Sequence, residues 1–194
     1  MNRKKIIVLI IPLIILIAFA SAYFAAYSAG ESLYLKTVPY DPTDLFRGDY
    51  VVLQYEIEDL DISLLDDDLY SLTKESSYTY YNVENKDVYI WYEDTKGYIE
   101  AVRVSSKKPS DGKYIKAELM YISEDFVPAE TPQTDPAVYN YKAFLDIGLD
   151  RFYLQEGTGK TFEDMSRKGE LIVEAKKFWN VYIIKDIFPA EELK

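Results

Sequence analysis

The sequence contains no histidine and no cysteine among its 194 residues. Without imidazole or thiol groups, the chain cannot assemble a Ser-His-Asp triad, a cysteine nucleophile, an iron–sulfur cluster, a disulfide or an ordinary structural zinc site. Only carboxylates, hydroxyls, phenols and the side chains of lysine and arginine remain for chemistry. We therefore expect no metal site, no cofactor and no enzymatic activity.

Basic residues are also scarce, with 22 against 33 acidic residues and a net charge of −11. Binding to a nucleic acid backbone needs lysine and arginine side chains that replace condensed counterions. The charge balance therefore excludes nucleic acid as a partner. A nucleotide is excluded as well. Gly159-Lys160-Thr161 resembles the end of a phosphate-binding loop, but the first glycine of that motif would have to be residue 154, and residue 154 is leucine.

Residues 6–30 carry no charged side chain. A helix of 25 residues at ~1.5 Å per residue is roughly 37 Å long, which exceeds the ~30 Å hydrocarbon core of a bilayer. Arg3, Lys4 and Lys5 precede this segment, so the positive-inside bias keeps the N-terminus in the cytoplasm. We predict a cytoplasmic tip and transmembrane signal anchor at 1–30, and one extracytoplasmic domain at 31–194 on the plasma or inner membrane.

A cleaved signal peptide is the alternative interpretation of this segment. The small-x-small spacing that signal peptidase accepts occurs at 18–20 and again at 20–22. Retention is favoured because the uncharged stretch is longer than the ~7–15 residues of a typical signal core. All 33 acidic residues and 19 of the 22 basic residues lie beyond residue 30, which leaves a net charge of −14 on the predicted exported part.

The remainder of the chain favours strands, because it is rich in tyrosine, valine and isoleucine. Segment 49–57 follows the two-residue period of a strand, in which Val51, Leu53, Tyr55 and Ile57 share one face. Similar patterns occur at 88–92, 98–104, 114–122, 143–149, 151–155, 171–176 and 181–187. A hairpin is predicted across 92–98, short helices at 62–73 and 162–168, and an irregular loop at 127–136.

These patterns predict a mainly β fold, with α+β as the alternative. The expected architecture is an N-terminal transmembrane helix followed by one antiparallel, barrel-like β-rich domain with one or two short helices.

The densest group of turn-forming and charged residues lies at 38–50, directly before the clearest predicted strand. Gly48 can adopt a positive φ, and Asp49 can accept hydrogen bonds from backbone amides as the chain enters the strand. Arg47 lies close in sequence to Asp44 and Asp49, which favours a local ion pair. Two interpretations stay open: these residues fix the entry to a strand, or they build a binding site.

The segment 48–55 reads GDYVVLQY and matches the signature of the GDYXXLXY protein family at every position, so the chain resembles these small bacterial proteins with an N-terminal hydrophobic segment. Residues 151–159 are similar to the second shared segment of the family, an aromatic strand closed by Glu-Gly-x-Gly. In many bacteria such proteins are encoded beside polytopic membrane proteins, so the resemblance implies a polytopic membrane partner, in addition to the lipid bilayer around residues 6–30. The binding candidates are Asp44, Arg47, Gly48, Asp49, Tyr50, Leu53, Tyr55, Arg151, Tyr153 and Glu156.

Two other functions remain as alternatives. The first is a hydrolase of envelope polymers that uses Asp49 and Glu156 as a carboxylate pair, since both are predicted at strand ends. The second is weak Ca²⁺ binding by the acidic residues at 56–68, although the spacing of an EF-hand is absent. A solvated acidic loop explains the same residues without a ligand.

Overall fold

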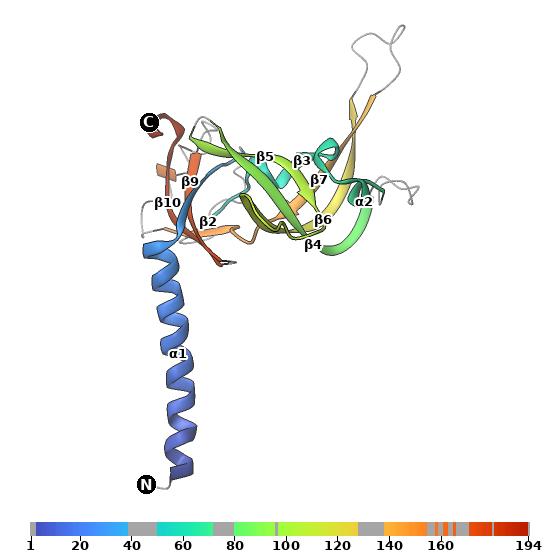
Figure 1. The fold of residues 1–194 in the computed structure, drawn as a ribbon. Coiled ribbons are helices and arrows are strands. Elements are labelled where there is room, and N and C mark those ends of the chain that lie inside the picture. The colour runs from blue at the N-terminus through green and yellow to red at the C-terminus, as the bar shows by residue number, and fades with distance from the viewer. Residues whose placement is uncertain are drawn as a thin grey trace, which may run out of the picture.

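The computed structural model describes residues 3–38, 50–71, 80–95, 97–127, 138–154, 158, 161–162, 165, 171–179 and 181–193. A long N-terminal helix, α1 (Arg3–Ala29), carries a β-rich domain at its C-terminal end (Figure 1). The apolar part of this helix, Ile7–Ala29, is long enough to cross a membrane, and the side chains of residues 7–24 are exposed. The predicted apolar helix is therefore present, with Pro12 inside it.

Ten strands follow in the described part of the chain, and every strand pair is antiparallel. They are β1 (Glu31–Lys36), β2 (Tyr50–Val52), β3 (Asp59–Asp61), β4 (Tyr80–Thr95), β5 (Tyr98–Ser105), β6 (Tyr114–Val127), β7 (Val138–Asp146), β8 (Arg151–Tyr153), β9 (Leu171–Phe178) and β10 (Val181–Pro189). They form three sheets with the orders β3-β7-β6-β4-β5, β1-β9-β10 and β2-β8.

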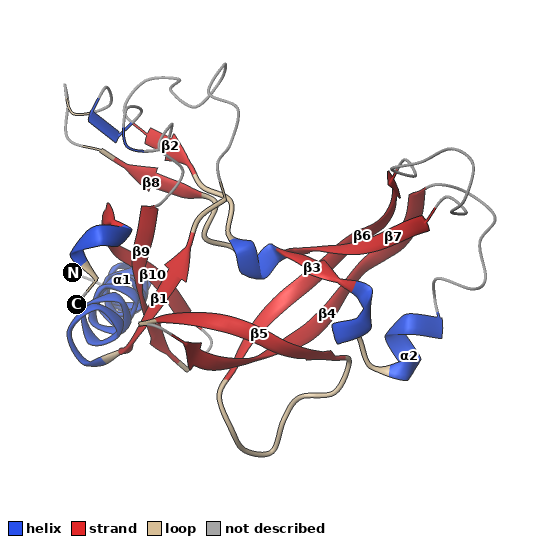
Figure 2. Ribbon diagram, turned by 90° about the horizontal axis from the view of Figure 1, so that it is seen from above, coloured by secondary structure: helices blue, strands red, loops and turns tan. Residues whose placement is uncertain are grey.

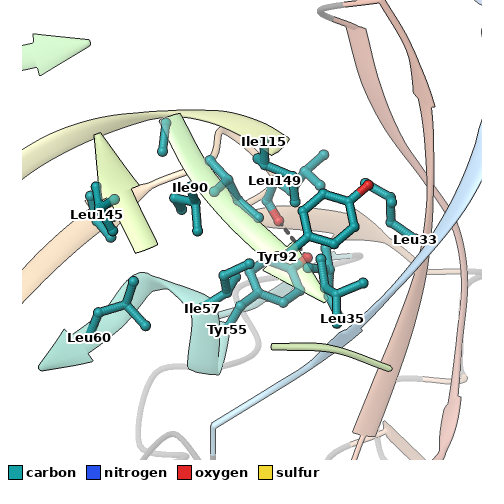
Figure 3. Close-up of a cluster of buried hydrophobic side chains, with 14 of the residues drawn as sticks. Leu33, Leu35, Tyr55, Ile57, Leu60, Ile90, Tyr92, Ile115, Leu145 and Leu149 are labelled. Atoms are coloured by element: carbon teal, nitrogen blue, oxygen red, sulfur yellow. Dashed lines mark hydrogen bonds between the residues drawn. The ribbon is translucent and has the colours of Figure 1, made fainter. Parts of the chain in front are cut away.

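The five-stranded sheet curls strongly, and β5 at its edge passes beside β1 of the three-stranded sheet (Figure 2). The result is a nearly closed, barrel-like wall, as the sequence predicts. The largest fully buried side chains come from several sheets and from the segment after β2; they include Leu33, Leu35, Tyr55, Ile90, Ile115 and Leu119, and Figure 3 shows part of this cluster. One hydrophobic core therefore joins the sheets.

The helix and the domain are joined by one residue, Gly30, which lies between the end of α1 and the start of β1. Its backbone N–H donates a 3.0 Å hydrogen bond to the carbonyl oxygen of Ala26. A Cβ atom at this position would collide with that oxygen and would lie 3.0 Å from the carbonyl oxygen of Lys177 on β9. The absence of a side chain at residue 30 thus lets the helix end pack directly against the sheet.

Three predicted strands end earlier than their patterns indicate, and the shortest of them, predicted at 151–155, ends at Tyr153. The strand predicted at 49–57 is interrupted after Val52, and a 3-10 turn, η1 (Glu56–Glu58), follows Tyr55. The alternation nevertheless persists through the interruption, because Val51, Leu53, Tyr55 and Ile57 are all buried. The strand predicted at 143–149 ends at Asp146. Its continuation is blocked by a turn in which Gly148 adopts a φ of 74°.

The predicted helix at 62–73 is also shorter than expected. A 3-10 turn, η2 (Ile62–Leu64), and the one-turn helix α2 (Asp67–Tyr70) are separated by Leu65 and Asp66, and Leu65 forms a β-bridge with Val104. Strand pairing therefore interrupts the helical pattern. The hairpin across 92–98 is confirmed, with Thr95 opposite Tyr98.

Several predicted features reach beyond the described residues. Residues 162 and 165 of the helix predicted at 162–168 are helical, as is Thr161 directly before it, and the rest of that segment lies outside the described ranges. The irregular loop predicted at 127–136 lies outside them as well, apart from Val127 at the end of β6.

Candidate binding site

Strands β2 and β8 bring together the two segments on which the family resemblance rests. Tyr50 lies opposite Tyr153, and Val52 lies opposite Arg151. The rings of Tyr50 and Tyr153 pack at a centroid distance of 6.0 Å, and the Arg151 guanidinium lies 6.0 Å from the Tyr50 ring centroid. Residues about one hundred positions apart in sequence thus form one small aromatic and cationic surface.

The same pairing separates the predicted candidates into two groups. Tyr153 and Arg151 are exposed, with 73% of the Tyr153 surface open to solvent. Leu53 and Tyr55 instead lie in the hydrophobic core. These two side chains are therefore placed to support the exposed surface and not to contact a ligand.

Tyr55 is the residue that fixes the loop before β8. Its side chain is fully buried, and its hydroxyl donates a 2.9 Å hydrogen bond to the carbonyl oxygen of Leu149 (Figure 3). The backbone N–H of Leu53 donates a 2.8 Å hydrogen bond to the carbonyl oxygen of Asp150. The two contacts hold residues 149 and 150 directly ahead of Arg151. Burial raises the pKa of Tyr55 well above its usual range, with Glu58 and Asp150 adding to the effect, so the phenol stays protonated.

Glu58 is a buried carboxylate that ties the segment after β2 to the segment after β7. Its two oxygens accept hydrogen bonds of 3.1 Å each from the backbone N–H groups of Tyr55 and Ile147. The pKa of Glu58 is raised to about 7, and burial is the largest cause. The two backbone hydrogen bonds lower the pKa, whereas the negative charges of Asp146 and Asp150 raise it. Glu58 is thus a structural group that titrates near neutral pH.

A groove of about 570 Å³ opens beside this surface. It is lined by Tyr23 of α1, by residues 148–153 and by residues 181–184 of β10. One wall is therefore the β8 segment, another is a strand of the three-stranded sheet, and the third is the helix that is long enough to cross a membrane. The lining mixes apolar and aromatic side chains with one ion pair at 3.1 Å, between Arg151 and Asp150.

The sheet beside the groove is held by a polar network on β9. Glu174 accepts hydrogen bonds from Ser32 at 3.0 Å and from Lys185 at 3.0 and 3.1 Å, and Lys176 lies 3.5 Å from the same carboxylate. Burial alone raises the pKa of Glu174, but the hydrogen bonds from Lys185 and Ser32 outweigh it and the pKa is lowered. The carboxylate thus stays ionised and joins β1, β9 and β10.

Half of the predicted site lies outside the described residues. Asp44, Arg47, Gly48, Asp49 and Glu156 all fall in this part of the chain, so the predicted ion pair and the carboxylate pair stay predictions. Sequence reasoning missed Tyr23 and the β10 wall of the groove. No local pattern connects these residues with β8, because only the packing of α1 and β10 brings them there.

Three of the acidic residues at 56–68 pair with basic residues on other strands. Lys36 pairs with Glu56 at 2.9 Å, and Lys142 pairs with Asp59 at 2.9 Å. Arg103 donates two hydrogen bonds to the carboxylate of Asp66. Among the described residues, no group of three or more histidine, cysteine, aspartate or glutamate side chains is arranged to hold a metal ion.

The fold and the site define a β-domain protein on an N-terminal apolar helix, with a groove at the junction. Comparison with known protein families matches residues 12–177 to the family described as GDYXXLXY protein. This match covers most of the sequence, and the chain belongs to the GDYXXLXY family. Curated proteins and solved structures returned no match.

Proposed function

We propose that this chain is a single-pass, membrane-anchored binding or accessory module without enzymatic activity, and that it docks a polytopic membrane protein on the extracytoplasmic side. Helix α1 is its signal anchor, its N-terminus is cytoplasmic, and the groove lined by Tyr23, β8 and β10 is the docking surface. The membrane is the plasma or inner membrane.

The position of the groove at the end of α1 is the observation that supports this proposal most strongly. Tyr23 lies on α1 six residues before the helix ends at Ala29, yet its side chain lines the same groove as Arg151 and Tyr153. A surface built jointly by a membrane-spanning helix and the domain above it faces the bilayer. A protein that presents its own short loops or helix ends at that level, as a polytopic membrane protein does, can reach it.

The chemistry of the groove suits a protein segment better than a small charged ligand. Val181, Ile183 and Ile184 supply apolar surface on one wall, whereas Tyr153 and Arg151 supply an aromatic ring and a guanidinium on the other. Tyrosine and arginine side chains of this kind are enriched among the residues that dominate protein interfaces. The predicted contact region, residues 41–50 with 151–159, includes Arg151 and Tyr153 of this wall, and Tyr50, whose ring packs on that of Tyr153.

Site-specific photocrosslinking in the native host tests this proposal. A photoreactive phenylalanine analogue at position 153 should crosslink to an integral protein with several membrane spans, and the same analogue at Val102, which is exposed on β5, should not. Mild-detergent co-purification of the same protein should be lost in Tyr153→Ser and Arg151→Glu but retained in Val102→Ser. A chain that crosslinks to nothing at 153 and repeatedly purifies alone would overturn the proposal.

The hydrolase alternative is tested separately. Asp49 directly precedes Tyr50, and Glu156 follows three residues after Tyr153, so the proposed pair flanks the β2–β8 ladder in sequence. If this pair hydrolyses an envelope polymer, Asp49→Asn should abolish turnover of that polymer and leave the thermal melt unchanged. A loss of stability without any turnover in the parent protein would make Asp49 a structural residue.

A further inference from the structure

The hairpin between β9 and β10 runs past the junction of helix and domain toward the side of the helix. Glu31, the first residue of β1, lies opposite Lys177 of β9, so the residues after Lys177 extend beyond the start of β1. Figure 1 shows the tip of this hairpin beside the upper end of α1. In a chain whose helix crosses a membrane, this tip reaches the level of the membrane surface.

The tip carries an exposed aromatic group. Trp179 has 86% of its surface open to solvent, and its ring is stacked on that of Phe178 at a centroid distance of 5.8 Å and an interplanar angle of 6°. Val181, on the other side of the turn, is exposed as well. Three apolar side chains therefore gather at the end of a hairpin, where polar turn residues are the ordinary choice.

The backbone at Trp179 supports a functional reason for this tip. Its φ of 57° makes it the only described residue other than glycine with a positive φ. The left-handed region is disfavoured for residues with a Cβ atom and is a genuine outlier for bulky ones. Glycine or asparagine would form the turn with less strain, so the sequence accepts a conformational cost and displays a tryptophan there. Strain of this kind persists where it serves a function.

The positive charge of Lys177, next to Phe178 in the sequence, does not prevent the tip from entering an apolar environment. The ammonium of Lys177 is turned inward, where it donates a hydrogen bond to the carbonyl oxygen of Tyr114 and lies 4.7 Å from the centroid of that ring. On α1, Tyr23 and Tyr27 are exposed within two turns of the helix end. The tip and the helix thus present aromatic side chains close to the same level.

We infer that the tip of the β9–β10 hairpin inserts Phe178, Trp179 and Val181 into the interfacial layer of the lipid bilayer that α1 crosses. The inference rests on the membrane anchoring in the proposed function and does not need the protein partner. Tryptophan suits this layer because its ring enters the apolar region while its N–H stays near water. The predicted exported part has a net charge of −14, so the contact depends on apolar and aromatic surface rather than on attraction to anionic headgroups.

A second membrane contact would fix the height and the rotation of the domain over the bilayer. Residues 181–184, which line the groove, begin directly after the hairpin turn. Insertion of the tip would therefore hold the open side of the groove close to the membrane surface.

Tryptophan fluorescence in vesicles tests the inference, because the chain has only two tryptophans. Full-length Trp91→Phe, in which Trp179 is the single tryptophan, is reconstituted into phosphatidylcholine vesicles that contain lipids brominated near the headgroup. We expect blue-shifted emission, at least twofold quenching by the brominated lipid, and little quenching by aqueous acrylamide. The matched variant Trp179→Phe, which keeps Trp91, should not respond to brominated lipid. If Trp91→Phe is unstable, 5-fluorotryptophan in the natural chain reports both positions by ¹⁹F NMR with paramagnetic lipid.

The outcomes separate this inference from the proposed function. Strong acrylamide quenching of Trp179 without lipid quenching would leave the tip in water and overturn the inference. Blue-shifted emission without lipid quenching would place the ring against protein and overturn it too. Resistance of the reconstituted chain to extraction at alkaline pH shows that α1 is anchored, whichever result Trp179 gives, and crosslinking at 153 tests the partner independently.

Discussion

The phenolic hydroxyl of Tyr55, the last residue of the family signature, donates a 2.9 Å hydrogen bond to the carbonyl oxygen of Leu149. Both residues are buried, so this bond ties the signature, inside the core, to the loop that leads into the second shared segment. It explains how a tyrosine with no solvent contact can shape an exposed groove. The loop that Tyr55 holds leads directly into Arg151 and Tyr153.

Tyr55→Phe should therefore destabilise the domain. The substitution keeps the ring but leaves the Leu149 carbonyl without its partner, and an unsatisfied buried group costs about 1–3 kcal/mol. Urea unfolding, followed by the near-UV signal, measures the loss in the free energy of unfolding. Tyr153→Phe is the matched control, because that hydroxyl is on an exposed side chain, and it should change stability by less than about 0.5 kcal/mol. Equal effects of the two substitutions would contradict this account.

Periodicity alone is enough to predict the inward face of the signature. Val51, Leu53, Tyr55 and Ile57 are buried as their alternation indicates, even though the strand is interrupted between Val52 and Tyr55. The interruption itself could not be predicted. In the turn that follows it, the Glu58 carboxylate accepts a hydrogen bond from the Tyr55 N–H, whereas the sequence shows Glu58 only as one of several acidic residues.

Long-range pairing accounts for most of what the sequence does not show. The pairing of β2 with β8, and the approach of β10 and Tyr23, join residues that no local pattern relates. The same holds for Glu56, Asp59 and Asp66, whose basic partners lie on β1, β7 and β5. Sequence reasoning therefore predicts the apolar helix and the β-rich class, but of the residues that line the groove it names only Arg151 and Tyr153 as binding candidates.

Gly30→Ala tests the direct connection between helix and domain. A new Cβ would contact the carbonyl oxygens of Ala26 and Lys177, and overpacking of this kind costs about 1–3 kcal/mol. Chemical unfolding in detergent micelles should show this loss, with a larger one for Gly30→Val. Ala29→Val adds bulk at the neighbouring exposed position and should cost no more than ~0.7 kcal/mol, through helix propensity alone. A penalty that does not grow with side-chain size would show that the junction has room to adjust.

The absence of natural cysteine makes the predicted topology directly testable. Ser110→Cys places one thiol on an exposed part of the domain, and Asn2→Cys places one on the predicted cytoplasmic tip. A membrane-impermeant maleimide added to intact spheroplasts should label the first variant and should label the second only after lysis. The opposite order of labelling would reverse the topology, and with it the compartment of any partner.

Millimolar Ca²⁺ should leave the thermal melt of the protein unchanged. Carboxylates that already have partners gain little from an ion, and Glu56, Asp59 and Asp66 are paired with Lys36, Lys142 and Arg103. A ligand that binds only the folded state raises the melting temperature with its concentration, so differential scanning fluorimetry with and without Ca²⁺ measures the effect. An increase that saturates with Ca²⁺, and that Mg²⁺ does not reproduce, would restore the alternative of a Ca²⁺ module.

Glu58 should make the domain less stable as the pH rises from about 5 to about 7.5. Its pKa in the folded protein is about 7, above the ordinary value of 4.5, so the folded state binds more protons than the unfolded state between these values. The stability that Glu58 contributes is therefore complete below pH 4.5 and is lost as the pH rises through 7. At roughly 1.4 kcal/mol per pKa unit, the loss amounts to about 3 kcal/mol.

Urea unfolding at several pH values measures this slope, and Glu58→Gln is the decisive variant. Glutamine has nearly the same shape but does not titrate, so the decline between pH 5 and 7.5 should become much flatter. The substitution also removes one of the two backbone hydrogen bonds, because the amide nitrogen of glutamine cannot accept one. Glu174 is a useful contrast, because its pKa is lowered in the folded protein. The stability that Glu174 contributes is therefore lost only as the pH falls below the ordinary pKa of a glutamate. A parent protein whose stability is constant from pH 5 to 7.5 would mean that the Glu58 carboxylate is solvated and does not carry its proton near neutrality.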